Sequence, residues 1–147
     1  MILPDVNVLV LAHRADQDHH EPVRAWLEEE VNSDRPFVLA DIAVAGFLRV
    51  VTNPRVYHRP TSLETAVAFI DGLVGQPTCV PVAAGGRHWV ILRDVLRDAD
   101  ARGNLVPDAH LAAIAIEHGA TVATRDRGFA RFRGVRWLDP LNGGSSA

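Results

Sequence analysis

Three aspartates occupy positions in the chain where carboxylates can do metal-assisted chemistry. Asp5 ends a short apolar segment that predicts a strand, Ile2–Asp5, and Asp126 closely follows a second such segment, Ala120–Thr124. Asp108 opens a helical pattern of apolar residues. Carboxylates that lie close together repel one another, and a divalent cation turns that repulsion into binding energy. Oxygen donors without cysteine or paired histidines favour Mg²⁺ or Mn²⁺.

A carboxylate site of this kind predicts hydrolysis of a phosphodiester, because a hard cation activates a water and neutralises the charge that develops on the phosphate. Each acid also has a purely structural interpretation. Asp108 follows Pro107 and can stabilise a helix N-terminus. Asp5 can form an Asx turn with Asn7, and Asp126 can belong to a surface turn. Because all three acids are expected at one edge of a sheet, we favour a common site.

Five further residues are candidates for supporting roles. Asn7 either orients a ligand or metal-bound water, or belongs to a turn, and Thr124 either contacts a phosphate, holds Asp126, or is an ordinary strand residue. Asp41 follows an apolar strand pattern and is an additional candidate acid. Arg125 and Arg127 begin an arginine cluster that either contacts nucleic-acid phosphates or lies in a solvated turn.

The segments that must position these residues alternate between strand-like and helix-like patterns. Besides the two strands above, the sequence predicts strands at 36–40, 79–82 and 135–138. Helices are predicted at 6–13, 21–31, 41–51, 87–102 and 108–118, and a capping box over 61–64 opens a further helix that runs to about 75. Apolar strands separated by helices indicate a three-layer α/β fold with a central, mostly parallel sheet. The carboxyl ends of such strands share one edge, where ligands bind.

The bulk composition fits one small domain. The chain has 147 residues, and we predict a single domain over residues 1–141 and a flexible tail over 142–147. The formal net charge of −3 argues against general coating of nucleic acid but does not exclude a nuclease. No apolar run is long enough to cross a membrane, the N-terminus lacks the pattern of a signal peptide, and the expected location is the cytoplasm.

Several segments together resemble a known family. Leu3–Leu9, Pro107–Ala115 and Ala123–Phe129 resemble the first, third and last acidic motifs of PIN-domain proteins. Gly46–Pro54 is similar to a segment found in one branch of the bacterial VapC toxins, and Trp137–Leu141 is similar to the ending of that branch. The resemblance covers essentially the whole chain, with the motifs in the expected order.

The resemblance implies a PIN fold and an endoribonuclease toxin that depends on Mg²⁺ or Mn²⁺, with Asp5, Asp108 and Asp126 as metal ligands. It also implies a homodimer and a cognate VapB-type antitoxin whose C-terminal tail blocks the site. Two alternatives keep the fold but change the function. One is a structure-specific DNA nuclease, and the other is a catalytically weakened PIN scaffold that binds RNA or an antitoxin without cutting.

One departure from the family pattern supports the weakened scaffold. The second acid of the family is expected near Val44, inside a helix, and this chain has no acid there. Asp41 lies about one helical turn earlier, so it either replaces the missing acid or serves only as the N-cap of its helix. A site with three acids predicts one firmly held metal ion instead of two.

Overall fold

A six-stranded sheet forms the centre of the protein in the computed structural model, which describes residues 1–142 and 145–146. The strand order is β3-β2-β1-β4-β5-β6. The first five strands of that order run parallel, and β6 joins β5 antiparallel. The strands are β1 (Ile2–Pro4), β2 (Phe37–Ala40), β3 (Cys79–Val82), β4 (Thr121–Ala123), β5 (Arg136–Leu138) and β6 (Ser145–Ser146).

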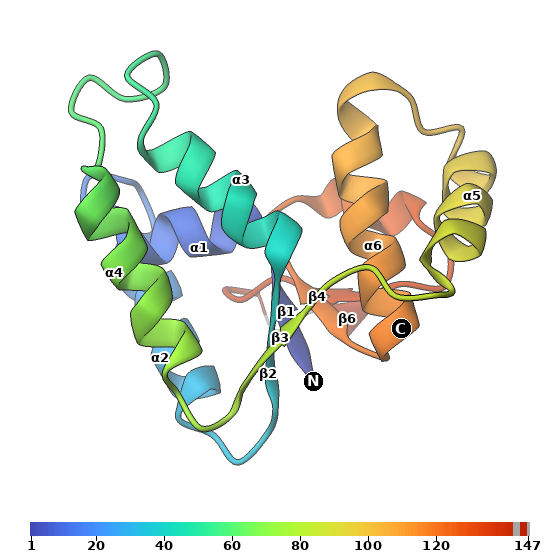
Figure 1. Cartoon of the computed structure of the whole chain (residues 1–147), viewed down its shortest axis with the longest axis horizontal. Coiled ribbons are helices and arrows are strands. Elements are labelled where there is room, and N and C mark those ends of the chain that lie inside the picture. The colour runs from blue at the N-terminus through green and yellow to red at the C-terminus, as the bar shows by residue number, and fades with distance from the viewer. Residues whose placement is uncertain (143–144, 147) are drawn as a thin grey trace.

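Helices cover both faces of this sheet. Helices α1, α2 and α4 lie on one side of it and α5 and α6 on the other, while α3 packs on α1 and α4 (Figure 1). The predicted three-layer α/β fold is therefore confirmed. The helices are α1 (Val6–His13), α2 (His20–Val31), α3 (Asp41–Val51), α4 (Leu63–Val74), α5 (His88–Ala99) and α6 (Val106–His118), with two short 3-10 turns, η1 (Gly103–Leu105) and η2 (Arg127–Arg131).

The core explains why the sheet is parallel and covered. All four residues of β2 are buried, as are Leu3 in β1 and Val122 in β4, so these strands have no face left for water. Helix α6 is rich in alanine, and the run 111–115 is buried completely or nearly so. Small side chains allow α6 to pack closely on β4, and the first turn of α6 lines one cavity together with the residues that follow β1 and β4.

Two predicted helix boundaries on this side of the sheet are wrong. Helix α5 ends at Ala99 and not at 102, because Asp100 adopts a left-handed backbone conformation with φ 48°. Aspartate tolerates that conformation better than most residues. Helix α6 begins at Val106, so Pro107 lies inside its first turn, where its missing N–H group costs nothing. Asp108 consequently lies in the first turn of α6.

Two further predicted boundaries differ by one residue. The first strand ends at Pro4 and not at Asp5, which is already the N-cap of α1. The N-cap of α4 is Ser62 instead of Thr61, and its hydroxyl accepts a hydrogen bond from the Thr65 backbone N–H.

The predicted C-terminal tail is described only in part. Within it, Ser145–Ser146 form β6 against β5, while residues 143, 144 and 147 lie outside the described residues. The flexibility of this tail stays a prediction. In the part of the chain that the structure describes, every helix is too short or too polar to cross a lipid bilayer.

Candidate active site at the carboxyl edge of the sheet

Asp5 is the most strongly fixed of the three acids. It follows β1 directly, and its backbone N–H continues the β1–β4 ladder by donating to Ala123 O at 2.9 Å. Its Oδ1 accepts the Val6 N–H at 2.7 Å and thereby caps α1. Its Oδ2 accepts the Thr124 hydroxyl at 2.8 Å and the Asn7 amide at 3.0 Å. With only 7% of its surface exposed, this carboxylate cannot turn away from the edge of the sheet.

Thr124 and Asn7 connect β1 to the segment that carries the last acid. Thr124 is fully buried, and its Oγ1 accepts hydrogen bonds from the Asn7 amide and from the Asp126 backbone N–H, both at 3.0 Å. Asn7 Oδ1 in turn accepts the Arg125 N–H at 3.0 Å. The hydroxyl and the amide therefore hold the segment after β4 against the start of α1, which sets where Asp126 lies relative to Asp5.

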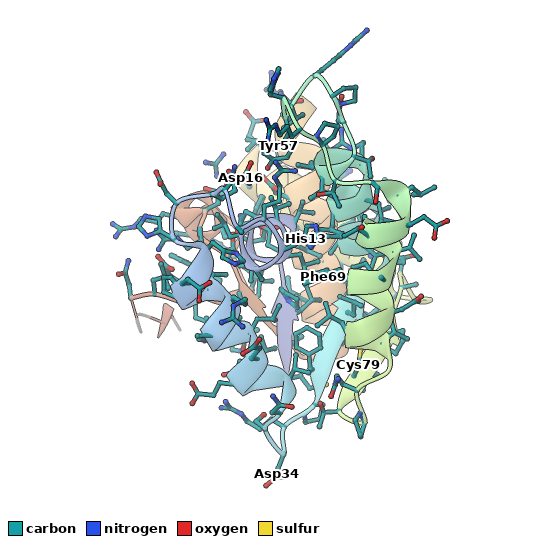
Figure 2. The ribbon with its side chains drawn as sticks, turned by 90° about the vertical axis from the view of Figure 1, so that its left-hand side faces the viewer. His13, Asp16, Asp34, Tyr57, Phe69 and Cys79 are labelled. Carbon is teal, nitrogen blue, oxygen red and sulfur yellow. The ribbon has the colours of Figure 1, made fainter. Side chains whose placement is uncertain are left out.

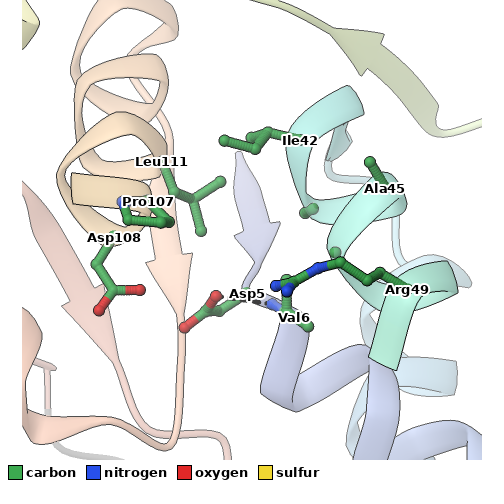
Figure 3. A pocket seen from close by; sticks show the side chains of 10 residues that line it. Asp5, Val6, Ile42, Ala45, Arg49, Pro107, Asp108 and Leu111 are labelled. Atoms are coloured by element: carbon green, nitrogen blue, oxygen red, sulfur yellow. Dashed lines mark hydrogen bonds between the residues drawn. The ribbon is translucent and has the colours of Figure 1, made fainter. Parts of the chain in front are cut away.

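Asp126 and Asp108 complete the acidic edge. Asp126 is the N-cap of η2 and uses Oδ1 to accept the Gly128 N–H at 2.8 Å. Asp108 lies in the first turn of α6 and points toward Asp5 (Figure 3). All three acids line one cavity of about 430 Å³. Because β1 and β4 pair directly, acids that are distant in sequence meet where the two strands end.

The electrostatics of the cavity are those of crowded like charges. The pKa of Asp108 is raised to about 6, chiefly by loss of solvent and also by the nearby carboxylates of Asp5 and Asp126, against a lowering by Arg131. Burial also raises the pKa of Asp5, and hydrogen bonds from Thr124, Val6 and Asn7 oppose this. The edge thus carries negative charge that its own residues do not neutralise.

The donor set fits Mg²⁺ or Mn²⁺ better than a softer metal. The site offers carboxylate, amide and hydroxyl oxygens. Among the described residues, Asp108 receives no hydrogen bond that would occupy its oxygens, and Asp5 Oδ1 and each oxygen of Asp126 accept at most one. Among the described residues, no group of three His, Cys, Asp or Glu side chains is already assembled to hold a metal ion. Mg²⁺ does not require such a cage, because it usually keeps several waters and uses one or two carboxylates.

Asp41 lies away from this acidic cavity. It is exposed, it occupies the first position of α3, and its Oδ1 accepts the adjacent Ile42 N–H at 2.7 Å. The N-cap of α3 is Ala40, so the expectation of Asp41 as the N-cap is wrong by one residue. Asp41 belongs to the walls of neither cavity that contains the acids, and α3 contributes no other acid.

The two arginines that we expect to contact nucleic acid, Arg125 and Arg127, differ from each other in their surroundings. The guanidinium of Arg125 binds both carboxylate oxygens of buried Asp139 at 2.8 Å, which ties the end of β4 to the residue after β5. Arg127 is exposed at the start of η2. Contact of either arginine with nucleic acid stays a prediction, and the geometry leaves Arg127 as the more accessible of the two.

Arg49 is a residue of the site that the sequence analysis did not single out. It extends from α3 toward Asp5 and Val6 across a second cavity of about 310 Å³ (Figure 3). Ile42, Gly46 and Arg49 recur at intervals of three and four residues, which places them on one face of a helix. This spacing is the feature of the sequence that could have indicated Arg49. It does not reveal which side of the sheet the face is turned toward.

Comparisons with known proteins agree with this geometry. A family profile described as the PIN domain matches residues 2–135. Ribonuclease VapC43 of Mycobacterium tuberculosis is 50% identical over 143 residues, 97% of each chain. Ribonuclease VapC25 of the same species is 44% identical over 140 residues, covering 95% of this chain and 99% of the relative.

Solved structures share the fold. VapBC2 from Rickettsia felis, bound to a DNA fragment from its promoter, superposes with a TM-score of 0.71 at 17% identity, over 95% of this chain and 98% of that one. VapC20 of Mycobacterium tuberculosis, a sarcin-ricin loop cleaving toxin, gives a TM-score of 0.68 at 12% identity, over 92% and 98%. The chain belongs to the PIN-domain family, in its branch of VapC ribonucleases.

Proposed function

We propose that this protein is a metal-dependent endoribonuclease that hydrolyses RNA phosphodiester bonds, the toxin of a type II toxin–antitoxin pair. The observation that carries the proposal is the convergence of Asp5, Asp108 and Asp126 on one cavity at the carboxyl edge of the sheet. The names of relatives at 44–50% identity support RNA as the substrate.

The residues divide the work in a way that follows from their contacts. Asp5, Asp108 and Asp126 would hold Mg²⁺ or Mn²⁺, which when bound supplies Lewis acidity to the phosphodiester and to an attacking water. Asp5 is held by three donors and provides a fixed reference point. Thr124 and Asn7 maintain the spacing of Asp5 and the Asp126 segment, so we assign them positioning roles.

Cleavage of total RNA tests the proposal. Wild-type protein with Mn²⁺ is compared with Asp5→Asn and with Asp98→Asn, a matched loss of one exposed acid on α5. We expect cleavage by wild type and by Asp98→Asn, and none by Asp5→Asn. Cleavage by all three would indicate a contaminating nuclease, and binding of RNA without cleavage by any of them would favour the weakened scaffold. Cutting of DNA but not RNA would favour the DNA nuclease.

We also propose a VapB-type antitoxin and a homodimer as the assemblies of this chain. The excess negative charge around Asp108 favours a basic side chain of a partner, which can replace the cation. Three apolar side chains of α5 and α6 are exposed, Trp89 (64%), Val90 and Val106, which suits burial against a second copy. We propose a cytoplasmic location, where cellular RNA is accessible to the enzyme. Light scattering of the purified chain tests the dimer.

A further inference from the structure

The cavity between α3 and α6 has an arginine at its wall, and apart from Asp5 and Asp108 the residues that line it have no role in the chemistry above. It is lined by Arg49, Ile42 and Gly46 from α3, and by Pro107 and Leu111 from α6. We propose that this cavity binds the nucleotide next to the cleaved bond and that Arg49 binds its phosphate. The inference rests on the proposed ribonuclease function and adds a substrate subsite to it.

The placement of the cavity relative to the acids is the first argument. Asp5, Val6 and Asp108 belong both to this cavity and to the cavity that contains Asp126. One cavity extends from these residues between α3 and α6, and the other extends along α1. A single-stranded RNA that crosses the acids therefore passes from one cavity into the other. The phosphate to be cleaved then lies at the wall that the two cavities share.

The state of Arg49 is the second argument. Its guanidinium reaches across the cavity toward Asp5 and Val6 (Figure 3). The ion pairs among the described residues do not include Arg49. Asp5, the nearby acid, is instead held by hydrogen bonds from Val6, Asn7 and Thr124. A free arginine fork beside an acidic edge fits a phosphate, which it can bind through two parallel hydrogen bonds.

The remaining walls fit a sugar and base. Ile42, Ala45, Pro107 and Leu111 present apolar atoms, and the volume of about 310 Å³ lies at the lower end of small-ligand pockets, with room for one nucleotide. Gly46 lets α3 pack closely against Val6 at the edge of the cavity, because a Cβ there would lie 2.6 Å from Val6 Cγ2. Since these walls offer almost no hydrogen-bonding groups, the subsite accepts any base and contributes affinity instead of sequence selection.

Binding of a fluorescent ten-nucleotide single-stranded RNA in EDTA tests the subsite without metal or turnover. We compare wild type with Arg49→Gln and with Arg133→Gln. Arg133 is also an exposed arginine, in the turn before β5, at the opposite edge of the sheet. Arg49→Gln should raise Kd about five- to tenfold and reduce the slope of log K against log salt by about 0.7, the value for one phosphate contact on a single strand. Arg133→Gln should change neither.

A second variant separates the cavity from the charge. Ile42→Trp narrows the cavity without altering charge, so it should weaken RNA binding while leaving the salt slope unchanged. The subsite would be overturned if wild type and Arg49→Gln had equal Kd values, equal salt slopes and similar unfolding temperatures. Cleavage of RNA by the wild type in that case would leave the proposed function intact. Absence of both RNA binding and RNA cleavage by wild type would overturn both.

Discussion

Replacing Asp108 by Asn should stabilise the metal-free protein. The pKa of Asp108 rises from 3.8 in the unfolded chain to about 6 in the folded protein. Between these two pH values the folded protein therefore holds a proton that the unfolded chain has released. Because the carboxyl pKa is raised on folding, the free energy of unfolding falls as the pH rises from 3.8 through about 6. The full loss of stability applies at neutral pH, where Asp108 is charged in both states. The Asn side chain has no charge to penalise.

The size of the effect follows from the shift and from exposure. A rise from 3.8 to about 6 corresponds to about 3 kcal/mol if it is fully retained. Asp108 is only half-buried, and solvent screening reduces the expected gain to about 1 kcal/mol. For a chain of this length, that gain raises Tm by about 2–4 °C. At pH 5 the gain should fall to about half, because wild-type Asp108 is then mostly protonated when folded.

Thermal unfolding in EDTA at pH 7.5 and pH 5 measures this difference, with Asp98→Asn as the control for loss of an exposed acid. Asp98→Asn should leave Tm unchanged. Adding Mn²⁺ should then raise the Tm of wild type more than that of Asp108→Asn, because binding to the folded state alone stabilises it. A variant no more stable than wild type at pH 7.5, or equally stabilised by Mn²⁺, would refute the reasoning.

Three other substitutions follow from the same contacts. Asp41→Asn should leave the Mn²⁺ dependence of cleavage unchanged, and a shifted metal requirement would make Asp41 a ligand after all. Thr124→Val leaves buried Asp5 short of a donor, so urea denaturation should show a loss of about 1–3 kcal/mol together with weaker cleavage. Gly46→Ala forces a Cβ against the stiff side chain of Val6, and the same assay should show a loss of about 1–3 kcal/mol; full stability would mean that α3 shifts freely.

The position of the acids was predictable because it depends on topology. Apolar strands alternating with helices indicate a parallel sheet, and a residue that follows such a strand must lie at its carboxyl edge. Asp5 and Asp126 satisfy this rule through the direct pairing of β1 with β4. The left-handed conformation of Asp100 and the use of Ser62 as a cap depend on local backbone energies that differ too little to be read from sequence.

Pairings across the fold were not predictable. Arg125 binds Asp139 because parallel pairing of β4 with β5 places the residues after both strands at the same edge. Arg49 reaches the acidic edge because α3 packs beside α1. Periodicity defines the face of a helix, but the neighbour that the face meets is decided by the packing of the whole chain.

Crystals of the protein soaked in Mn²⁺ show whether the three aspartates hold a metal ion, because the anomalous signal identifies the ion without reference to activity. We predict a peak bonded to at least two of the carboxylates of Asp5, Asp108 and Asp126, at the cavity they share. A peak bound only elsewhere would contradict this prediction. So would crystals at saturating Mn²⁺ in which these carboxylates are directed apart and no peak lies between them.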